Sequence, residues 1–309
     1  MRKAPRLKPG DRIGILAPAG PVESEVLARG VDRLCGWGFQ PVLGGAVLGE
    51  YGYLAATDAE RAADFNALWS DPTIAGIICA RGGYGSMRIL EQIDWELVAE
   101  QPKFFCGFSD VTALHLAMNR RTQLVTFHGP MAAAFGDGEA YNGVRLLAAM
   151  TTGGPLGRIP WPALNEVSPY PVVIRPGSAE GRLIGGNLTT LCALMGTPWE
   201  PEFDGRILLL EEVGEPLYRV DRMLTQLLLS GKLRRVSGIL FGDSPEPGPP
   251  GPSLMPELLR ELLGPLEVPV LYGFPCGHTA YRATLPLGVM ARLDVANADL
   301  TMLEGALTW

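Results

Sequence analysis

A serine stands where a short apolar stretch gives way to a helical pattern, in the run Gly107-Phe108-Ser109-Asp110. A serine at a sharp strand-to-helix turn holds its hydroxyl clear of the sheet, where it can act as a nucleophile. The amide of Asp110 would lie at the helix N-terminus, where unpaired N–H groups favour the negative charge of a tetrahedral oxyanion. Val111 replaces the last glycine of the GxSxG pattern, so Ser109 or Asp110 as an ordinary helix N-cap is the alternative.

A second turn, Arg81-Gly82-Gly83-Tyr84-Gly85, follows the apolar run of residues 74–80. Glycines let backbone amides approach an anion closely, which makes Gly82 or Gly83 a candidate second donor to the oxyanion. The spacing is not GxGxxG, and no acidic residue ends a second strand about 20 residues later, so a nicotinamide or flavin site is disfavoured. A tight connection without a chemical role is the alternative.

A serine nucleophile needs a base, and the chain has three histidines. His115 lies six residues after Ser109 on the same predicted helix, pointing away from its N-terminal end, which favours a structural role. His128 ends an apolar run before Gly-Pro, where it could line a site or a turn. His278 lies in a glycine-rich loop after the predicted strand 268–272, the kind of loop that carries catalytic groups. The residues alone favour His278 over His128 only modestly.

The base in turn needs a carboxylate to orient it, and Glu211 and Glu212 end the apolar strand that begins at Ile207. Successive side chains of a strand point to opposite faces, so only one of these two glutamates can face the site. The alternation does not reveal which one, and two glutamates at a strand end are also common on solvated surfaces. No metal-binding motif and no P-loop is present, so we expect neither a metal nor a cofactor.

The elements that position these residues follow from the pattern of the whole chain. Short apolar runs alternate with helical spacing through the first half, which predicts βαβ units with a parallel sheet. Six prolines fall in residues 153–177 and predict a crossover linker. We therefore expect an N-terminal α/β domain at 1–152, this linker, and a C-terminal domain at 178–309. Short apolar runs broken by glycine and asparagine after Thr284 suggest β-structure there.

Composition narrows the classes of function. The 309 residues carry 26 basic and 33 acidic side chains, a net charge of −7, without a Lys/Arg run, so a nucleic-acid partner is not expected. No stretch approaches the roughly 18 apolar residues of a membrane span, and the basic start lacks the apolar segment of a signal peptide. The five cysteines are scattered and form no CxxC pair. These features predict a cytoplasmic protein with reduced thiols.

Eight ordered motifs resemble the LD-carboxypeptidase family of serine peptidases, over nearly the whole chain. They are Leu7-Lys8-Pro9-Gly10-Asp11 leading into Ala17-Pro18-Ala19-Gly20, Ala80-Arg81-Gly82-Gly83-Tyr84-Gly85, Gly107-Phe108-Ser109-Asp110-Val111-Thr112-Ala113-Leu114, His128-Gly129-Pro130, Gly185-Gly186-Asn187-Leu188, Leu210-Glu211-Glu212-Val213-Gly214-Glu215, Tyr218-Arg219-Val220-Asp221-Arg222 and Gly277-His278-Thr279. The resemblance implies a parallel-sheet α/β domain followed by a β-rich swivelling domain, with the active site between them and a homodimer as a common assembly. One departure is Glu212, where the family often has Asp.

The resemblance also implies the chemistry. A Ser–Glu–His triad maps onto Ser109, Glu211 and His278, with the oxyanion held by the Asp110 amide and the Gly82 or Gly83 amide. The expected substrate is a murein tetrapeptide recycled in the cytoplasm, which loses its terminal D-Ala. A second branch is similar to the microcin C immunity peptidases, which cut aminoacyl-nucleotide toxins. The runs Arg-Gly-Gly-Tyr-Gly and Glu-Glu-Val-Gly-Glu favour the murein branch.

Two further residues are candidates for substrate binding. A carboxypeptidase must recognise a free carboxylate, and Arg81 stands at the end of a strand expected near the one that carries Ser109. Bracing of the glycine turn by Arg81 is an equal alternative. His128 is the second candidate. A non-catalytic sugar- or nucleotide-binding protein and a nicotinamide oxidoreductase are the rival classes of function.

Overall fold

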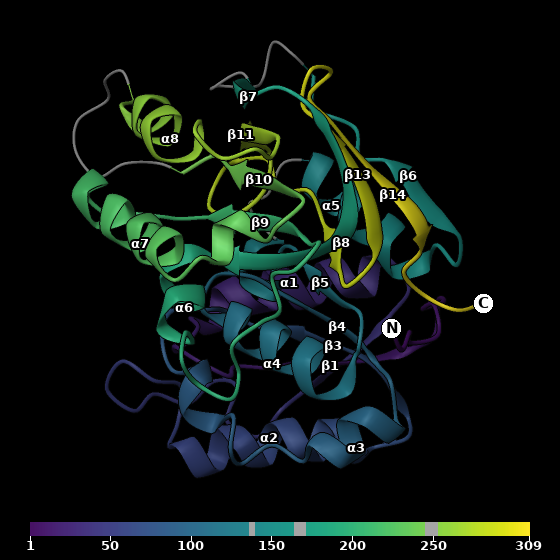
Figure 1. The fold of residues 1–309 in the computed structure, drawn as a ribbon. Helices are drawn as coiled ribbons and strands as arrows, with labels where there is room; N and C mark the ends of the chain where they lie inside the picture. Colours follow the sequence, from purple (N-terminus) through teal and green to yellow (C-terminus); the bar gives the residue numbers. More distant parts are fainter. Residues whose placement is uncertain (136–139, 164–170, 245–252) are drawn as a thin grey trace.

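The computed structural model describes residues 1–135, 140–163, 171–244 and 253–309, which form two halves built on two β-sheets (Figure 1). The first sheet has the order β12-β5-β4-β3-β1-β2, with β1 at Arg12–Leu16, β2 at Gln40–Leu43, β3 at Ile74–Cys79, β4 at Phe104–Gly107, β5 at Thr126–His128 and β12 at Leu285–Leu287. Strands β1 to β5 pair in parallel, which confirms the predicted βαβ organisation. Strand β3 is apolar because helices cover both faces of such a sheet.

The second sheet has the order β6-β14-β13-β8-β9-β10-β11-β7. Its strands are β6 at Pro155–Arg158, β7 at Val172–Arg175, β8 at Ser178–Asn187, β9 at Ile207–Glu211, β10 at Gly238–Gly242, β11 at Val270–Phe274, β13 at Met290–Asp294 and β14 at Asp299–Gly305. Strands β8 to β11 are parallel and the outer strands are antiparallel, so the C-terminal half is rich in β-structure, as predicted.

Helices pack against both sheets (Figure 1). They are α1 at Ser24–Gly36, α2 at Asp58–Ser70, α3 at Trp95–Glu100, α4 at Thr112–Thr122, α5 at Ala140–Thr151, α6 at Leu188–Ala193, α7 at Leu217–Leu229 and α8 at Met255–Leu263. Helix α4 lies where the two halves meet (Figure 1). Helix α7 shows how the sequence specifies this packing, because Val220, Leu224 and Leu227 recur at helical spacing and are the residues it buries. Within the described ranges, no helix is long and apolar enough to cross a membrane.

The stretch 153–177 contains two short strands, β6 and β7, and both pair at the edges of the second sheet. Edge strands tolerate proline because one side of the strand makes no ladder hydrogen bonds. Residues 164–170 of the predicted linker lie outside the described residues. In addition, β12 from the C-terminal part of the chain pairs with β5 of the first sheet. The proposed boundaries at 152 and 178 therefore stay a prediction.

The two halves meet where β8 ends against the start of α4. Gly185 and Gly186 have positive φ angles of 121° and 143°, and a methyl group at Gly186 would approach Thr112 Oγ1 within 2.4 Å. The amide of Asn187 donates to the same hydroxyl at 2.9 Å. Glycine is required at this joint, because a side chain would push the C-terminal strands away from the turn that begins at Ser109.

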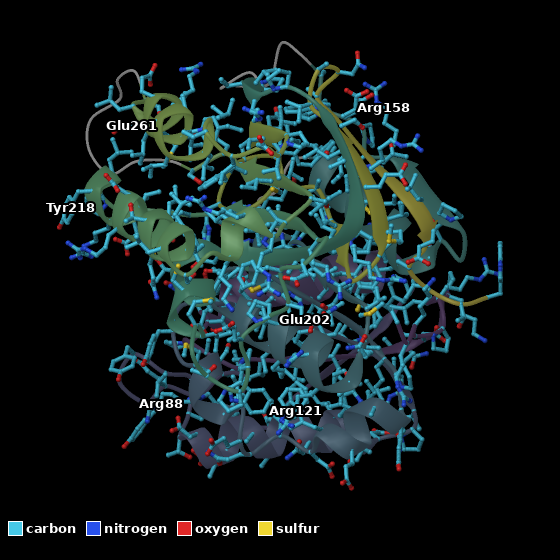
Figure 2. All side chains as sticks on the ribbon, viewed as in Figure 1. Arg88, Arg121, Arg158, Glu202, Tyr218 and Glu261 are labelled. Carbon is cyan, nitrogen blue, oxygen red and sulfur yellow. The ribbon has the colours of Figure 1, made fainter. Side chains whose placement is uncertain are left out.

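Charged side chains lie on the outside of both halves (Figure 2), except for a few buried ones, which are Arg61, Lys103, Asp110, Glu211 and Glu212. Figure 2 places Arg88 and Arg121 on the half that holds the first sheet, and Arg158, Tyr218 and Glu261 on the outside of the other half. All five cysteines are free, and four of them are buried.

Candidate active site

Ser109 occupies the turn between β4 and α4 and has a φ angle of +63°, a conformation that non-glycine residues rarely adopt. A short 3-10 turn, Ser109–Val111, leads from it into α4. A methyl group at Gly107 would lie 2.7 Å from Val111 Cγ1, so the strand can turn this sharply only with glycine there. Backbone strain at a partly exposed serine is a feature of nucleophile turns.

The Arg81–Gly85 turn lies directly against this serine. A methyl group at Gly82 would be 3.0 Å from Ser109 Cβ, 3.2 Å from its Oγ and 3.4 Å from the Asp110 amide nitrogen. The carbonyl of Gly82 accepts a hydrogen bond from the Gly20 amide at 3.0 Å. Because the peptide unit is trans, the N–H of Gly83 points the opposite way from that carbonyl, away from Gly20.

The side chain of Asp110 fastens the two turns together. Its Oδ2 accepts a hydrogen bond from the Ser86 amide at 2.8 Å, and Asp110 itself is buried. The structure therefore brings together Ser109, Asp110, Gly82 and Gly83, four of the residues predicted from sequence.

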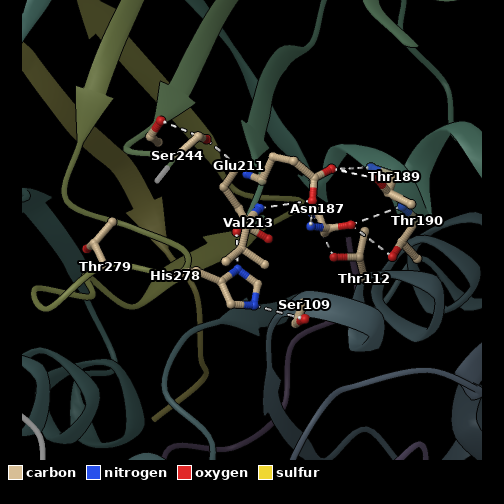
Figure 3. A network of polar contacts seen from close by, with 12 residues as sticks. Ser109, Thr112, Asn187, Thr189, Thr190, Glu211, Val213, Ser244, His278 and Thr279 are labelled. Atoms are coloured by element: carbon tan, nitrogen blue, oxygen red, sulfur yellow. Dashed lines mark hydrogen bonds and ion pairs between the residues drawn. The ribbon is translucent and has the colours of Figure 1, made fainter. Parts of the chain in front are cut away.

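His278 joins this group from the C-terminal half of the chain (Figure 3). Its Nε2 lies 3.0 Å from Ser109 Oγ, and its Nδ1 lies 2.6 Å from Glu211 Oε2. An ionised carboxylate can only accept, so Nδ1 carries the proton and Nε2 is free to accept the proton of the serine hydroxyl. Serine, histidine and glutamate thus form one hydrogen-bonded chain in the order that nucleophilic catalysis requires.

Glu211 is the last residue of β9 and is fully buried. Burial alone would raise the pKa of its carboxyl group, but favourable interactions with His128 and His278 outweigh it and lower that pKa to about 2. The carboxylate is consequently ionised at any pH at which His278 could work as a base. The geometry also answers the question that strand alternation left open, because Glu211 faces the serine and its neighbour does not.

Glu212 belongs to a separate network of hydrogen bonds, and Figure 3 labels its partners Asn187, Thr189, Val213 and Ser244. Its two carboxylate oxygens accept from Asn187 Nδ2 at 3.0 Å, from the amide and hydroxyl of Thr189 at 2.8 and 2.7 Å, and from the Val213 amide at 3.0 Å. Its own amide donates to Ser244 Oγ at 3.0 Å. These bonds fix the ends of β8 and β9, so Glu212 supports the site structurally.

His128 lies at the end of β5 and is only 1% exposed. Its Nε2 is 4.0 Å from Glu211 Oε1, the oxygen that His278 does not use, and neither atom has a hydrogen-bond partner at this distance. Substrate binding by His128 stays a prediction, and the ring lies deeply buried beside Glu211. Its position behind Glu211 is that of a support for the carboxylate.

His115 is also buried, and its Nε2 donates to the carbonyl of Gly107 at 2.9 Å. Burial lowers the pKa of His115 to about 3, so the ring stays neutral in the folded protein. The structure thus gives His115 the structural role expected from its position on the helix, as a brace between α4 and the strand that ends at the serine turn.

Two arginines, Arg81 and Arg282, lie near the site and differ in their contacts. Arg81 is exposed, and its Nη1 donates to the carbonyl of Pro21 at 2.8 Å, which fits the alternative that it braces the glycine turn. Arg282 was not singled out from the sequence, since a lone arginine in a loop carries no pattern. Its guanidinium lies 5.6 Å from the centre of the Phe108 ring, beside Ser109.

No group of three or more histidine, cysteine, aspartate or glutamate side chains is arranged to hold a metal ion in the part of the chain that the structure describes.

Comparison with known proteins gives matches along most of the chain. Residues 13–129 match the model of the LD-carboxypeptidase N-terminal domain, and residues 180–293 match that of the LD-carboxypeptidase C-terminal domain. A Bacillus subtilis protein named "Probable murein peptide carboxypeptidase" is 36% identical over 98% of this chain and 95% of its own length.

Two solved proteins are similar in structure as well. The microcin C7 self-immunity protein MccF of Escherichia coli is 32% identical over 96% of this chain and 94% of its own, and a structure of MccF covers both chains completely with a TM-score of 0.91. The muramoyltetrapeptide carboxypeptidase from Oxalobacter formigenes is 31% identical, with a TM-score of 0.82 over 96% of this chain and 100% of its own.

Proposed function

The chain belongs to the LD-carboxypeptidase family, and from that premise we propose that it is a serine peptidase that releases the terminal D-Ala from a murein tetrapeptide during cell-wall recycling. The observation that carries this proposal is the hydrogen-bonded chain from Ser109 through His278 to Glu211. Its members come from three distant parts of the sequence, and each distance suits proton transfer or orientation. We place the enzyme in the cytoplasm and expect a homodimer, as the family resemblance implies.

In the proposed reaction, Ser109 Oγ attacks the carbonyl carbon of the scissile peptide bond while His278 Nε2 takes the hydroxyl proton. Glu211 holds the imidazole in the required tautomer and stabilises the imidazolium that forms. His278 then gives the proton to the amine of the leaving D-Ala, which leaves an ester on Ser109. A water molecule, activated by the same histidine, hydrolyses this ester and restores the serine hydroxyl.

The negative charge on the carbonyl oxygen needs donors during both steps. We assign this role to the amides of Asp110 and Gly83, with Gly82 as the alternative to Gly83. The close approach of Gly82 to both Ser109 and the Asp110 nitrogen supports the assignment, because it puts the glycine turn beside the first donor. Loss of one such donor typically costs about 100- to 1000-fold in kcat.

His128 takes a positioning role in this proposal. A buried carboxylate oxygen without a hydrogen bond is unfavourable, and so is a buried imidazole without one. A small movement would let His128 Nε2 donate to Glu211 Oε1 and satisfy both groups at once. Glu211 would then be held from two sides, by His278 and by His128.

The relatives differ in the substrates and ligands that their names describe. One is a muramoyltetrapeptide carboxypeptidase, whereas structures of MccF are complexes with glutamyl sulfamoyl guanosine and aspartyl sulfamoyl adenosine. The high TM-score with MccF makes cleavage of aminoacyl-nucleotide analogues the second candidate function. The Arg81–Gly85 turn and the run after Glu211 favour the murein peptide.

The test is a substrate comparison with the purified full-length chain. Murein tri-, tetra- and pentapeptides and aspartyl sulfamoyl adenosine are each incubated with the enzyme, and the products are identified by mass spectrometry. We expect conversion of the tetrapeptide to the tripeptide and free D-Ala, with the nucleotide left intact. Cleavage of the nucleotide without cleavage of the tetrapeptide would select the second candidate.

A further inference from the structure

We propose that Arg282 is the residue that binds the terminal carboxylate of the substrate and so makes the enzyme a carboxypeptidase. This inference rests on the proposed function, because it names the group that recognises one end of the proposed substrate. A carboxypeptidase that releases one residue has its substrate's carboxylate only one residue beyond the scissile carbonyl, a distance of about 3.5 Å. The cation that binds it must therefore stand beside Ser109.

Arg282 lies beside Ser109, because its guanidinium contacts the ring of the preceding residue, Phe108. The ring of Phe108, directly before the serine, lies 4.8 Å from the ring of His278, and the guanidinium of Arg282 lies 5.6 Å from the centre of the same phenyl ring. The proposed base and this cation thus share one aromatic neighbour. A guanidinium over an aromatic face keeps its N–H groups free at the edges, where they can donate to a carboxylate in pairs.

Apart from its contact with the Phe108 ring, the guanidinium of Arg282 has no hydrogen bond or ion pair to the described residues. Its Nε is buried without a hydrogen-bond partner, and none of the ion pairs in the described ranges includes Arg282. Burial lowers the pKa of Arg282, and the negative charge of Glu211 opposes that effect. The two groups therefore interact electrostatically, although they do not form an ion pair. Arg282 as a whole is partly exposed, so its terminal nitrogens can meet an incoming carboxylate, which would give this partly buried charge the acceptor that the described side chains do not provide.

Hydrogen bonds fix the backbone around Arg282 before any substrate binds. Asn142 of α5, itself buried, accepts a hydrogen bond from the Arg282 amide at 2.6 Å and donates to the carbonyl of Ala280 at 2.9 Å. The Ala283 amide donates to Pro275 at 2.7 Å and closes the loop that carries both His278 and Arg282. The loop holds the base and the cation in one arrangement, which lowers the entropy cost of binding.

Arg81 is the competing candidate for this role, and its surroundings differ. It is exposed, and its guanidinium already donates to the carbonyl of Pro21. An exposed cation contributes less to a carboxylate contact than one removed from water. The geometry therefore points to Arg282 for the contact with the terminal carboxylate.

The experiment compares two substrates in four forms of the full-length enzyme. The substrates are the murein tetrapeptide with its free carboxylate and the same peptide amidated at the C-terminus. The enzymes are wild type, Arg282→Gln, Arg282→Lys and the control Arg121→Gln, which also loses an arginine over an aromatic ring but lies at the far end of α4 (Figure 2). The measured quantity is the ratio of kcat/KM for the free acid to kcat/KM for the amide, with thermal unfolding recorded for each variant.

We expect wild type to prefer the free acid and Arg282→Gln to reduce this preference about 10- to 100-fold, the usual effect of losing a charge-assisted hydrogen bond. Arg282→Lys keeps the charge but loses the paired donors, so its preference should fall less. The control should keep the wild-type ratio. An unchanged ratio in folded Arg282→Gln and Arg282→Lys would overturn the inference. An equal loss of kcat/KM for both substrates would also overturn it, because that result would mean that Arg282 only supports Glu211. Failure of wild type to cleave the tetrapeptide would instead contradict the proposed function.

Discussion

Replacement of Gly277 by alanine should separate the proposed base from its carboxylate. Gly277 precedes His278 and has a φ angle of +84°. A methyl group there would lie 2.6 Å from Glu211 Oε2, 2.7 Å from its Cβ and 2.8 Å from its Cγ. The Cβ atom is fixed to strand β9 and cannot swing aside, so the loop that carries His278 must move away from Glu211.

The size of the effect follows from two contributions. The left-handed backbone conformation costs alanine about 1–2 kcal/mol of stability. The loss of alignment between Glu211 and His278 approaches the loss of the carboxylate itself, which lowers kcat by about 10⁴-fold in a serine protease. We therefore expect Gly277→Ala to lower kcat/KM by about 10²- to 10⁴-fold, or about 3–5 kcal/mol of transition-state stabilisation.

The assay measures D-Ala release from the murein tetrapeptide together with thermal unfolding. Gly205→Ala is the matched control, because Gly205 also has a positive φ angle, 65°, but no atom lies within 4 Å of the added methyl group. It should show a similar loss of stability with kcat/KM within about threefold of wild type. Wild-type activity in both variants, or an equal loss in both, would show that the contact between residue 277 and Glu211 does not control the alignment of His278.

Three further predictions concern the neighbouring groups. Glu211→Gln should lower kcat/KM by about 10⁴-fold at nearly unchanged stability. Glu212→Gln should mainly lower the free energy of unfolding, by about 1–3 kcal/mol. Kinetics and denaturant unfolding measure the two effects, and the reverse pattern would contradict the roles assigned to the two glutamates. The pKa of His115 is lowered to about 3, so between about pH 6 and pH 4 the unfolded chain binds a proton that the folded protein does not, and stability falls as pH falls. His115→Gln should make this decline shallower by about 1.4 kcal/mol per pH unit, and an unchanged slope would refute a buried neutral His115. EDTA should not alter peptidase activity, and loss of activity restored by a divalent ion would show that a metal takes part.

The serine turn and the glycine turn could be predicted from the sequence, because each is formed by a few consecutive residues. Glycine, serine and an apolar strand within a few residues leave few backbone conformations open, and the structure has Ser109 at positive φ beside Gly82, as such turns require. The parallel sheet was readable for the same reason, from strands that alternate with helical spacing.

The contacts between residues that are far apart in the sequence could not be predicted from hydrophobic periodicity or motifs. Strand alternation puts Glu211 and Glu212 on opposite faces but does not say which face meets α4, and only the family resemblance chose between them. The approach of His128 to Glu211 depends on how β5 and β9, from different sheets, pack together. Arg282 was missed altogether, since its position over Phe108 follows from the folding of a loop around Asn142.

A serine peptidase without its nucleophile releases almost no product, so the role of Ser109 can be measured from D-Ala release. Initial rates of D-Ala release from the murein tetrapeptide are compared for wild type and Ser109→Ala, after matched thermal unfolding has shown that both are folded. We expect release by wild type and a loss of about 10⁶-fold in kcat for the variant, as in a serine protease without its nucleophile. Release by Ser109→Ala at a rate near that of wild type would contradict it.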